Sequence, residues 1–219
     1  MDKLRMRFSK SGRAVYISHL DLMHTFQRAF SRAGYRLKYS EGFNPHPILS
    51  IALPLSVGTS SACELMDFRL DGEADITEMP ERLTKALPEG VEVSEVYEAE
   101  RKITELKWLE AEGNFRYDEL PDPEALRRFY AQQGIVISKK TKSGISDVDI
   151  VPGIKNIEIE ANDTEPGSLR IHAVVSAQNP TINPDLLAEA LRQLRADLAP
   201  VFVSFRRVNV YDEKMNRFQ

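Results

Sequence analysis

The fold is decided by residues 3–34, which read KLRMRFSKSGRAVYISHLDLMHTFQRAFSRAG. In the opening part, residues 3–8, basic and apolar side chains alternate with the two-residue period of a half-buried strand. This pattern predicts a strand that turns its apolar side chains towards the core. Its outer face would carry the cations Lys3, Arg5 and Arg7.

A helix is predicted to follow over residues 19–33. Its apolar residues, among them Leu22 and Phe26, recur every three or four positions and would form one core-facing stripe. Ser18 is a preferred N-cap residue, and glycine, here Gly34, is the usual residue just after a helix. The helix is therefore expected to lie between these two residues.

The rest of the first half continues with strand, strand, helix and strand. The patterns predict strands over 35–39, 64–70 and 91–97, a helix over 75–87, and a strand or an extended loop over 48–55. With the opening stretch, this order is that of the split βαβ or ferredoxin-like arrangement, in which an antiparallel sheet carries two helices.

The second half repeats this order with one extra strand. It predicts strands over 105–116, 135–140, 154–160, 169–176 and 201–211, helices over 123–133 and 184–198, and a polar loop over 142–146. The sequence therefore predicts an α+β protein of two tandem ferredoxin-like domains with antiparallel sheets. They would span residues 1–102 and 103–219, divided in a charge-dense segment.

The composition is that of a folded globular protein, with 42% hydrophobic and 28% charged residues among 219. Apolar runs fall short of the roughly 20 residues that span a bilayer, and the opening residues lack the apolar part of a signal peptide. We therefore expect a cytoplasmic protein without membrane association. The single cysteine, Cys63, excludes an internal disulfide and a self-contained iron–sulfur cluster.

Charge is distributed unevenly along the chain. Residues 1–50 hold nine basic and three acidic side chains, a net charge of +6, whereas the other 169 residues hold 20 basic and 30 acidic ones, a net charge of −10. A basic region attached to an acidic body suggests an anionic partner that one surface recognises.

One groove for RNA or another phosphate-rich ligand is predicted to be lined by the cations Arg28, Arg32, Arg36 and Lys38, together with Lys3, Arg5 and Arg7. Aromatic side chains between them would stack on bases. A solvated charged face is the alternative explanation.

A stiff loop follows, SEGFNPHPILSIALPLSVG over residues 40–58. Pro45 and Pro47 push Asn44 and His46 towards extended backbone, which predicts an exposed, firmly held histidine. Such a histidine can serve as an acid–base catalyst, bind a ligand or simply belong to a turn.

The start of the predicted helix is a second candidate site. Amide groups at a helix N-terminus attract phosphate or carboxylate, and His19 can donate to the same anion. Capping by Ser18 and Asp21 explains the same residues without a ligand. A metal site at His19, Asp21, His24 and His46 is not expected, because His19 and His24 are about 500° apart on a helix.

In the second half, Lys140 and Lys142 precede a glycine turn, and Asp147 and Asp149 follow it. The lysines are candidate anion ligands, and alternate carboxylates on one strand face could hold magnesium or an amine. A hairpin with charged residues at its tip explains them equally well. Phosphate-binding and nucleophile motifs are missing, so we expect no cofactor in this chain.

Residues 5–34 and 39–61, with the motifs SHLD and GFNPHP in this order, resemble a bacterial family of unknown function, the radical-SAM-linked proteins. The resemblance is strongest over the first third of the chain. It implies an accessory subunit fused to or encoded beside a radical enzyme, and that partner would carry the iron–sulfur cluster, S-adenosylmethionine and cobalamin. It also implies neighbouring ribonuclease and ribosomal-protein genes, which favours an RNA substrate.

The family's motif residues fall on Ser18, His19, Asp21, Arg28, Ser40, Gly42, Asn44, Pro45 and His46, and the resemblance establishes no catalytic role for them. Our first hypothesis is a non-catalytic accessory protein that binds RNA, either tRNA or rRNA, for modification by the radical enzyme. The predicted binding residues are Arg5, Arg7, Ser18, Asp21, Arg28, Arg32, Lys38, Ser40, Asn44, His46, Lys140 and Lys142, with no metal site.

Two alternatives stay open. The chain could be a metal-independent RNA-processing or RNA-modifying enzyme that uses His46 or His19 as its acid–base group. It could also be a scaffold that binds other proteins and no RNA.

Overall fold

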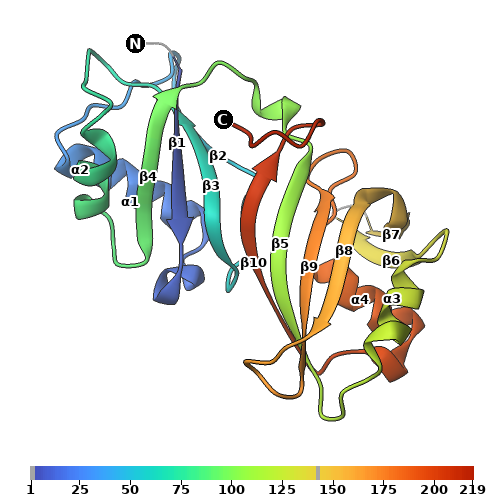
Figure 1. The fold of residues 1–219 in the computed structure, drawn as a ribbon. Helices are drawn as coiled ribbons and strands as arrows, with labels where there is room; N and C mark the ends of the chain where they lie inside the picture. The colour runs from blue at the N-terminus through green and yellow to red at the C-terminus, as the bar shows by residue number, and fades with distance from the viewer. Residues whose placement is uncertain (1–2, 142–143) are drawn as a thin grey trace. The chain divides into compact units, whose positions relative to one another are not determined.

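The structure, a computed structural model, describes residues 3–141 and 144–219. The chain divides into two compact units, Met1–Glu105 with Gln219 and Leu106–Phe218. Within the described residues, each unit combines antiparallel strand pairs with two α-helices (Figure 1). The predicted α+β class is therefore confirmed.

The first unit alternates strands and helices in the order β1, α1, β2, β3, α2, β4. These elements span Leu4–Lys10 (β1), His19–Arg32 (α1), Leu49–Ala52 (β2), Ser60–Phe68 (β3), Met79–Ala86 (α2) and Val91–Glu98 (β4). Within this unit the strand order is β4-β1-β3-β2, and each neighbouring pair is antiparallel. β1 is thus flanked by strands on both of its edges.

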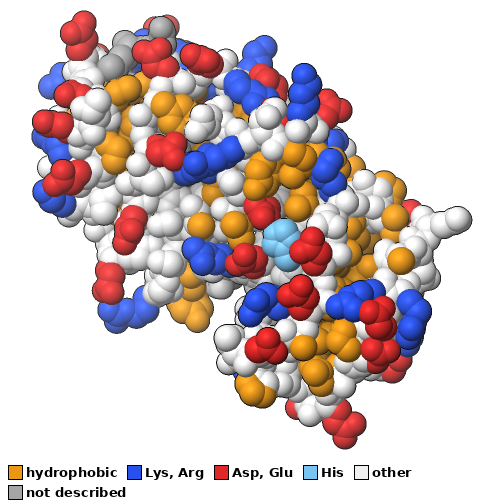
Figure 2. Space-filling model, viewed as in Figure 1, with side chains coloured by type: hydrophobic (Ala, Val, Ile, Leu, Met, Phe, Trp, Pro, Cys, Tyr) orange, Lys and Arg blue, Asp and Glu red, His pale blue; other side chains and the backbone are white. Residues whose placement is uncertain are grey.

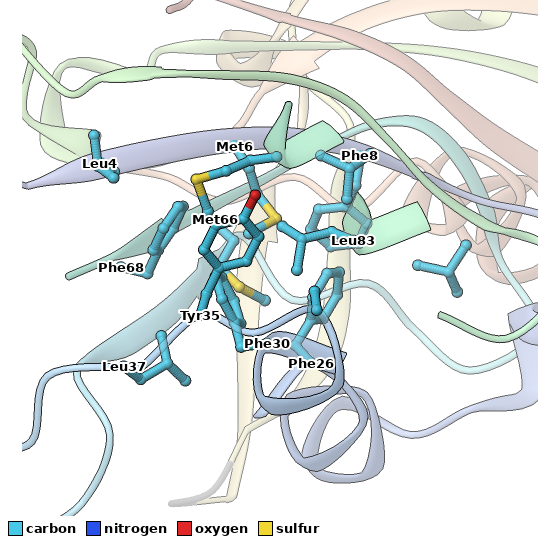
Figure 3. Packing of buried hydrophobic residues seen from close by; sticks show 14 of the residues in the cluster. Leu4, Met6, Phe8, Phe26, Phe30, Tyr35, Leu37, Met66, Phe68 and Leu83 are labelled. Atoms are coloured by element: carbon cyan, nitrogen blue, oxygen red, sulfur yellow. The ribbon is translucent and has the colours of Figure 1, made fainter. Parts of the chain in front are cut away.

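The core of this unit follows the predicted patterns of β1 and α1. Leu4, Met6 and Phe8 are completely buried, and the Phe8 ring meets the ring of Phe26 from α1 edge-on, with centroids 4.8 Å apart. Figure 3 shows these side chains packed with others from β3 and α2, among them Met66 and Leu83. Burial of each such side chain contributes about 1.5–3 kcal/mol, so this packing fixes α1 against the sheet.

The second unit contains four antiparallel strands, two α-helices and an added hairpin. Its elements span Trp108–Arg116 (β5), Pro123–Tyr130 (α3), Val136–Thr141 (β6), Gly144–Asp149 (β7), Ile154–Ala161 (β8), Ser168–Ser176 (β9), Asp185–Leu194 (α4) and Phe202–Tyr211 (β10). The strand order within this unit is β10-β5-β9-β8, again antiparallel, while β6 and β7 form a two-stranded sheet.

The predicted strand over 35–39 is wrong. This segment makes only isolated bridges, Leu37 with Leu70 and Tyr39 with Pro47. The reason is that its backbone forms hydrogen bonds with two different segments. The Lys38 N–H donates to the Arg69 carbonyl, while the Lys38 carbonyl accepts from the Ile48 N–H. A continuous ladder with one partner strand does not form.

The predicted polar loop over 142–146 is also wrong where the structure describes it. Residues 144–146 belong to β7, which pairs antiparallel with β6, so the extra strand is one arm of a hairpin. Residues 142 and 143 lie outside the described residues. Among the described residues, every helix is too short or too polar to cross a bilayer.

Candidate anion-binding site

A hollow of about 650 Å³ lies at the C-terminal end of α1 in the first unit. The last turns of α1, the segment that follows it and Pro47 form its walls. Its charged lining residues include Arg28, Arg32 and Arg36, and its aromatic ones are Tyr35 and Tyr39. We call this cavity the arginine hollow.

Local sequence features explain why the three arginines line the same hollow. Arg28 and Arg32 are four residues apart in α1 and therefore lie on the same helix face. After α1, Gly34 adopts a φ of +84°, a conformation that favours glycine and turns the chain back. Arg36 then lies between the buried residues Tyr35 and Leu37, so its side chain faces solvent.

The arginine hollow has more positive charge than its neighbours neutralise. Arg28 has no hydrogen bond or ion pair within the described part of the chain, and Arg32 donates to the Ala86 carbonyl, which carries no charge. Arg36 lies 3.8 Å from Asp71, but both side chains are mostly exposed and water screens the pair. Guanidinium groups whose charge is not neutralised by a nearby carboxylate in a dry environment are suited to binding phosphate.

The α1 C-terminus by itself repels anions, because the helix dipole places partial negative charge there. Arg82 from α2 offsets part of this charge by donating to the Ala33 carbonyl at 2.7 Å. The same guanidinium lies over the Tyr35 ring, 5.0 Å from its centroid. Burial raises the pKa of Tyr35 against the opposing effect of Arg82, so its phenol stays neutral at physiological pH.

The loop that holds His46 is closed by hydrogen bonds to Ser40. The Ser40 hydroxyl accepts from the His46 backbone N–H at 3.1 Å and lies 2.9 Å from His46 Nδ1. The Ser40 N–H donates to the His46 carbonyl at 2.8 Å. These contacts occupy Nδ1 and leave Nε2 on an exposed ring, as the sequence predicted.

The structure brings several predicted binding residues to this end of the first unit. Pro47 lines the arginine hollow and also a neighbouring hollow that contains His46. Lys38 is exposed, and its carbonyl accepts from Ile48, directly after Pro47. Asn44 is exposed, and its carbonyl lies 3.4 Å from His46 Nδ1. Arg28 and Arg32 thus share one hollow with Pro47 and His46 shares the other, while Lys38, Ser40 and Asn44 are linked to the loop by hydrogen bonds or short contacts.

The residues of the SHLD motif lie at the other end of α1. Ser18 caps the helix: its hydroxyl accepts from the Asp21 N–H at 3.2 Å and donates to the Asp21 carboxylate at 2.7 Å. Because α1 rises about 1.5 Å per residue, roughly 20 Å separate His19 from Arg32. The structure therefore does not bring Ser18, His19 or Asp21 to the site around His46, and it favours capping for this motif.

The prediction that Arg5 and Arg7 face solvent is wrong. Arg5 is completely buried and binds Asp67 of β3 through two hydrogen bonds, of 2.6 and 3.2 Å. Arg7 is nearly as buried, and its guanidinium donates to Cys63 Sγ at 2.6 Å. Both lie on a strand flanked on both edges, where the neighbouring strands supply partners, so neither can reach an anion at the surface.

The candidates in the second unit play structural roles where they are described. Asp147 accepts from the Ser138 hydroxyl across the β6–β7 hairpin at 2.8 Å, and Asp149 accepts from the Ile135 and Val151 N–H groups. The described residues contain no group of three His, Cys, Asp or Glu that could hold a metal ion. Lys142 and the side chain of Lys140 lie outside what the structure describes.

Figure 2 shows basic and acidic side chains intermixed on the face that it displays. The predicted groove included Arg36, although the set of predicted binding residues left it out, and its position between buried Tyr35 and Leu37 exposes it at the arginine hollow. The sequence did not single out His172, whose Nε2 lies 2.8 Å from Glu110 on a neighbouring strand, because 62 residues separate the pair.

Comparisons with known proteins identify relatives but no activity. A family model described as "Uncharacterized protein conserved in bacteria (DUF2344)" matches residues 3–184. A comparison with curated proteins gives no match. Among solved structures, an unknown protein from Galdieria sulphuraria is 13% identical over 94% of this chain and 96% of that one, with a TM-score of 0.27.

Proposed function

The chain belongs to the uncharacterised bacterial family DUF2344, and we propose from the site itself that it is an RNA-binding protein. The observation that carries this proposal is the arginine hollow. It places Arg28, Arg32 and Arg36 around one cavity, with the exposed ring of Tyr39 at its wall. Cationic grooves with aromatic side chains bind nucleic acid by neutralising phosphates and stacking on bases.

The second part of the proposal concerns the biological setting. We propose that the protein is an accessory subunit that presents RNA, either tRNA or rRNA, to a radical S-adenosylmethionine enzyme. The resemblance of residues 5–34 and 39–61 to radical-SAM-linked proteins supports this setting. Purification of the tagged chain from its own cell, followed by identification of the bound protein and RNA, tests it. An enzyme with an iron–sulfur cluster is the expected companion.

The topology supports a finer description of the fold. In the first unit, the element order β1-α1-β2-β3-α2-β4 and the strand order β4-β1-β3-β2 favour a split βαβ, ferredoxin-like domain. In the second unit, the order β10-β5-β9-β8 favours the same arrangement, with the β6–β7 hairpin inserted after α3. Sheets of this kind are a common platform for RNA recognition.

The proposal is tested by the salt dependence of RNA binding, measured by fluorescence anisotropy with a labelled unstructured RNA. The double variant Arg28→Glu, Arg36→Glu should bind at least about tenfold more weakly than the wild type. The log–log salt slope should also become shallower by about 0.7 for each phosphate that the variant no longer neutralises.

A matched control is available in the second unit. Arg128 and Arg192 are exposed residues of α3 and α4, each within 3.5 Å of an acidic neighbour. The variant Arg128→Glu, Arg192→Glu changes the net charge by the same amount and should bind RNA as the wild type does. Absence of binding, binding independent of salt, or an equally weakened control contradicts the proposed function.

One observation favours a second candidate, RNA cleavage. Ser40 holds Nδ1 of His46 and leaves Nε2 exposed, which is how a positioned acid–base group is arranged. His19 lies near the opposite end of α1, so the two histidines cannot act on one phosphodiester together. Cleavage of labelled RNA in the presence of a chelator, abolished in His46→Ala, would favour the enzyme.

The same charge-reversal variant distinguishes RNA binding from the remaining alternative, a scaffold that binds only proteins. A scaffold would bind its partner equally well after Arg28→Glu and Arg36→Glu.

A further inference from the structure

A second hollow, of about 440 Å³, borders the arginine hollow in the first unit. Pro47 lines both cavities, and His46 lines only the second. The other charged residues of this second cavity are Lys3, Asp67 and Arg69. We call it the histidine hollow.

The histidine hollow also has positive charge in excess. Asp67 is only 4% exposed, and the buried Arg5 binds both of its carboxylate oxygens. Because Arg5 already neutralises Asp67, Lys3 adds charge that is not cancelled, although its Nζ lies 2.5 Å from the same carboxylate. Lys3 is 42% exposed and can turn towards a ligand.

Arg69 supplies the second cation of the histidine hollow. Its backbone is fixed on both sides, since its N–H donates to Ile48 and its carbonyl accepts from Lys38. Its side chain is exposed and makes no ion pair or hydrogen bond with the described residues. Each hollow thus contains at least one arginine whose guanidinium is available to a phosphate.

A loop that we call the ridge lies beside both hollows, because Pro47 lines each of them. It runs from Ser40 to Pro47, and the Ser40–His46 hydrogen bonds and the Tyr39–Pro47 bridge hold it closed. On this ridge Phe43 is fully exposed and Tyr39 is 55% exposed. Two aromatic rings in water beside two cationic cavities offer faces on which unpaired bases can stack.

We propose that the two hollows hold consecutive phosphates of one unpaired RNA strand, which crosses the ridge at Pro47 with the His46 imidazole between the phosphates. This inference rests on the proposed function and makes it more specific. A duplex does not fit, because its bases are stacked inside the helix and cannot reach Phe43 or Tyr39. A single nucleotide uses only part of the site, because its one phosphate occupies only the arginine hollow.

The test uses the full chain and single-stranded oligonucleotides of increasing length, from a nucleoside monophosphate to an oligomer of about eight nucleotides. Affinity should rise steeply once the oligomer carries enough phosphates to occupy both hollows. A perfectly paired duplex of the same sequence should bind at least about tenfold more weakly than the single strand.

Two variants separate the contributions of the two hollows. Arg69→Glu should weaken binding of the long single strand about tenfold or more and make its salt slope shallower by about 0.7. It should leave binding of the monophosphate unchanged, whereas Arg28→Glu should weaken both. Lys3→Gln is a second variant for the histidine hollow, and thermal unfolding verifies that each variant is folded.

The possible results are distinguishable. If the wild type binds the long strand but Arg69→Glu and Lys3→Gln bind it equally well, the two-hollow path is wrong and the proposed function stands. Equal affinity for the duplex, or for the monophosphate and the long strand, also overturns the path. If the wild type binds no RNA at all, both proposals fail.

Discussion

Arginine has two opposite roles in the first unit, and its surroundings decide which. Arg5 and Arg7 are buried among carboxylate, carbonyl and thiol groups, whereas Arg28 and Arg36 are exposed at the arginine hollow. A charged side chain enters the interior only when partners there replace its water. The buried arginines therefore shape the unit, and the exposed ones are available to a ligand.

The buried pair of Arg5 and Asp67 leads to a prediction about stability. Asp67→Asn removes the carboxylate charge that binds the buried Arg5 guanidinium through two hydrogen bonds, which should lower the free energy of unfolding by about 3–5 kcal/mol. Urea titration followed by circular dichroism measures this decrease.

The control is Asp71→Asn, which removes an exposed carboxylate 3.8 Å from Arg36. Its effect should stay within about 1 kcal/mol. Equal destabilisation of the two variants would mean that the Arg5–Asp67 pair does not behave as a buried ion pair.

At the scale of elements, α1 has different roles at its two ends. Its N-terminus is closed by the reciprocal hydrogen bonds of Ser18 and Asp21, and its C-terminal turns carry two arginines of the arginine hollow. The helix is the rigid spacer between them. The two sequence motifs of the resemblance, SHLD and GFNPHP, consequently lie near opposite ends of one element.

This separation predicts that Ser18→Ala changes stability and not binding. Removal of the N-cap should cost about 1 kcal/mol of unfolding free energy. RNA affinity should be unchanged, because the substitution lies roughly 20 Å from Arg32 along the helix. Denaturant unfolding and RNA anisotropy on the same preparation measure the two effects, and weaker binding at unchanged stability would show that the SHLD motif contacts the ligand.

The elements that the sequence predicted well are those with local causes. The opening strand and the helix over 19–33 were read from periodicity and from caps, and both lie within a few residues of the predicted bounds. The segment 35–39 was not predictable in this way. Its backbone forms hydrogen bonds with residues 48 and 69, and only folding brings these residues next to it.

At the scale of the whole molecule, buried and half-buried tyrosines predict instability in alkali. Burial raises the pKa of Tyr35, Tyr97, Tyr117 and Tyr130 above the ordinary value of 10.0. Above this pH the unfolded chain releases phenolic protons that the folded chain retains. The folded state then binds more protons, so the free energy of unfolding falls as pH rises.

We expect the tyrosine contribution to the free energy of unfolding, measured in urea from about pH 8 to about pH 11, to stay constant at first. It should then fall as the phenols of the unfolded chain lose their protons. The decline can reach about 1.4 kcal/mol per pH unit for each tyrosine. Tyr117→Phe should reduce it by one tyrosine's share, whereas Tyr16→Phe, at a residue 73% exposed, should not. A decline that Tyr117→Phe leaves unchanged would contradict this assignment.

Sequence patterns alone predicted the α+β class, the strand and helix of the opening stretch, the N-cap at Ser18 and the exposure of His46. These features depend on periodicity, capping and proline geometry, which act over a few residues. Only folding established that Arg5 and Arg7 are buried, that the SHLD motif lies away from His46, and that Pro47 lines two cationic hollows. The physical reason is that the exposure and partners of a side chain depend on residues that are distant in sequence, such as Asp67 for Arg5.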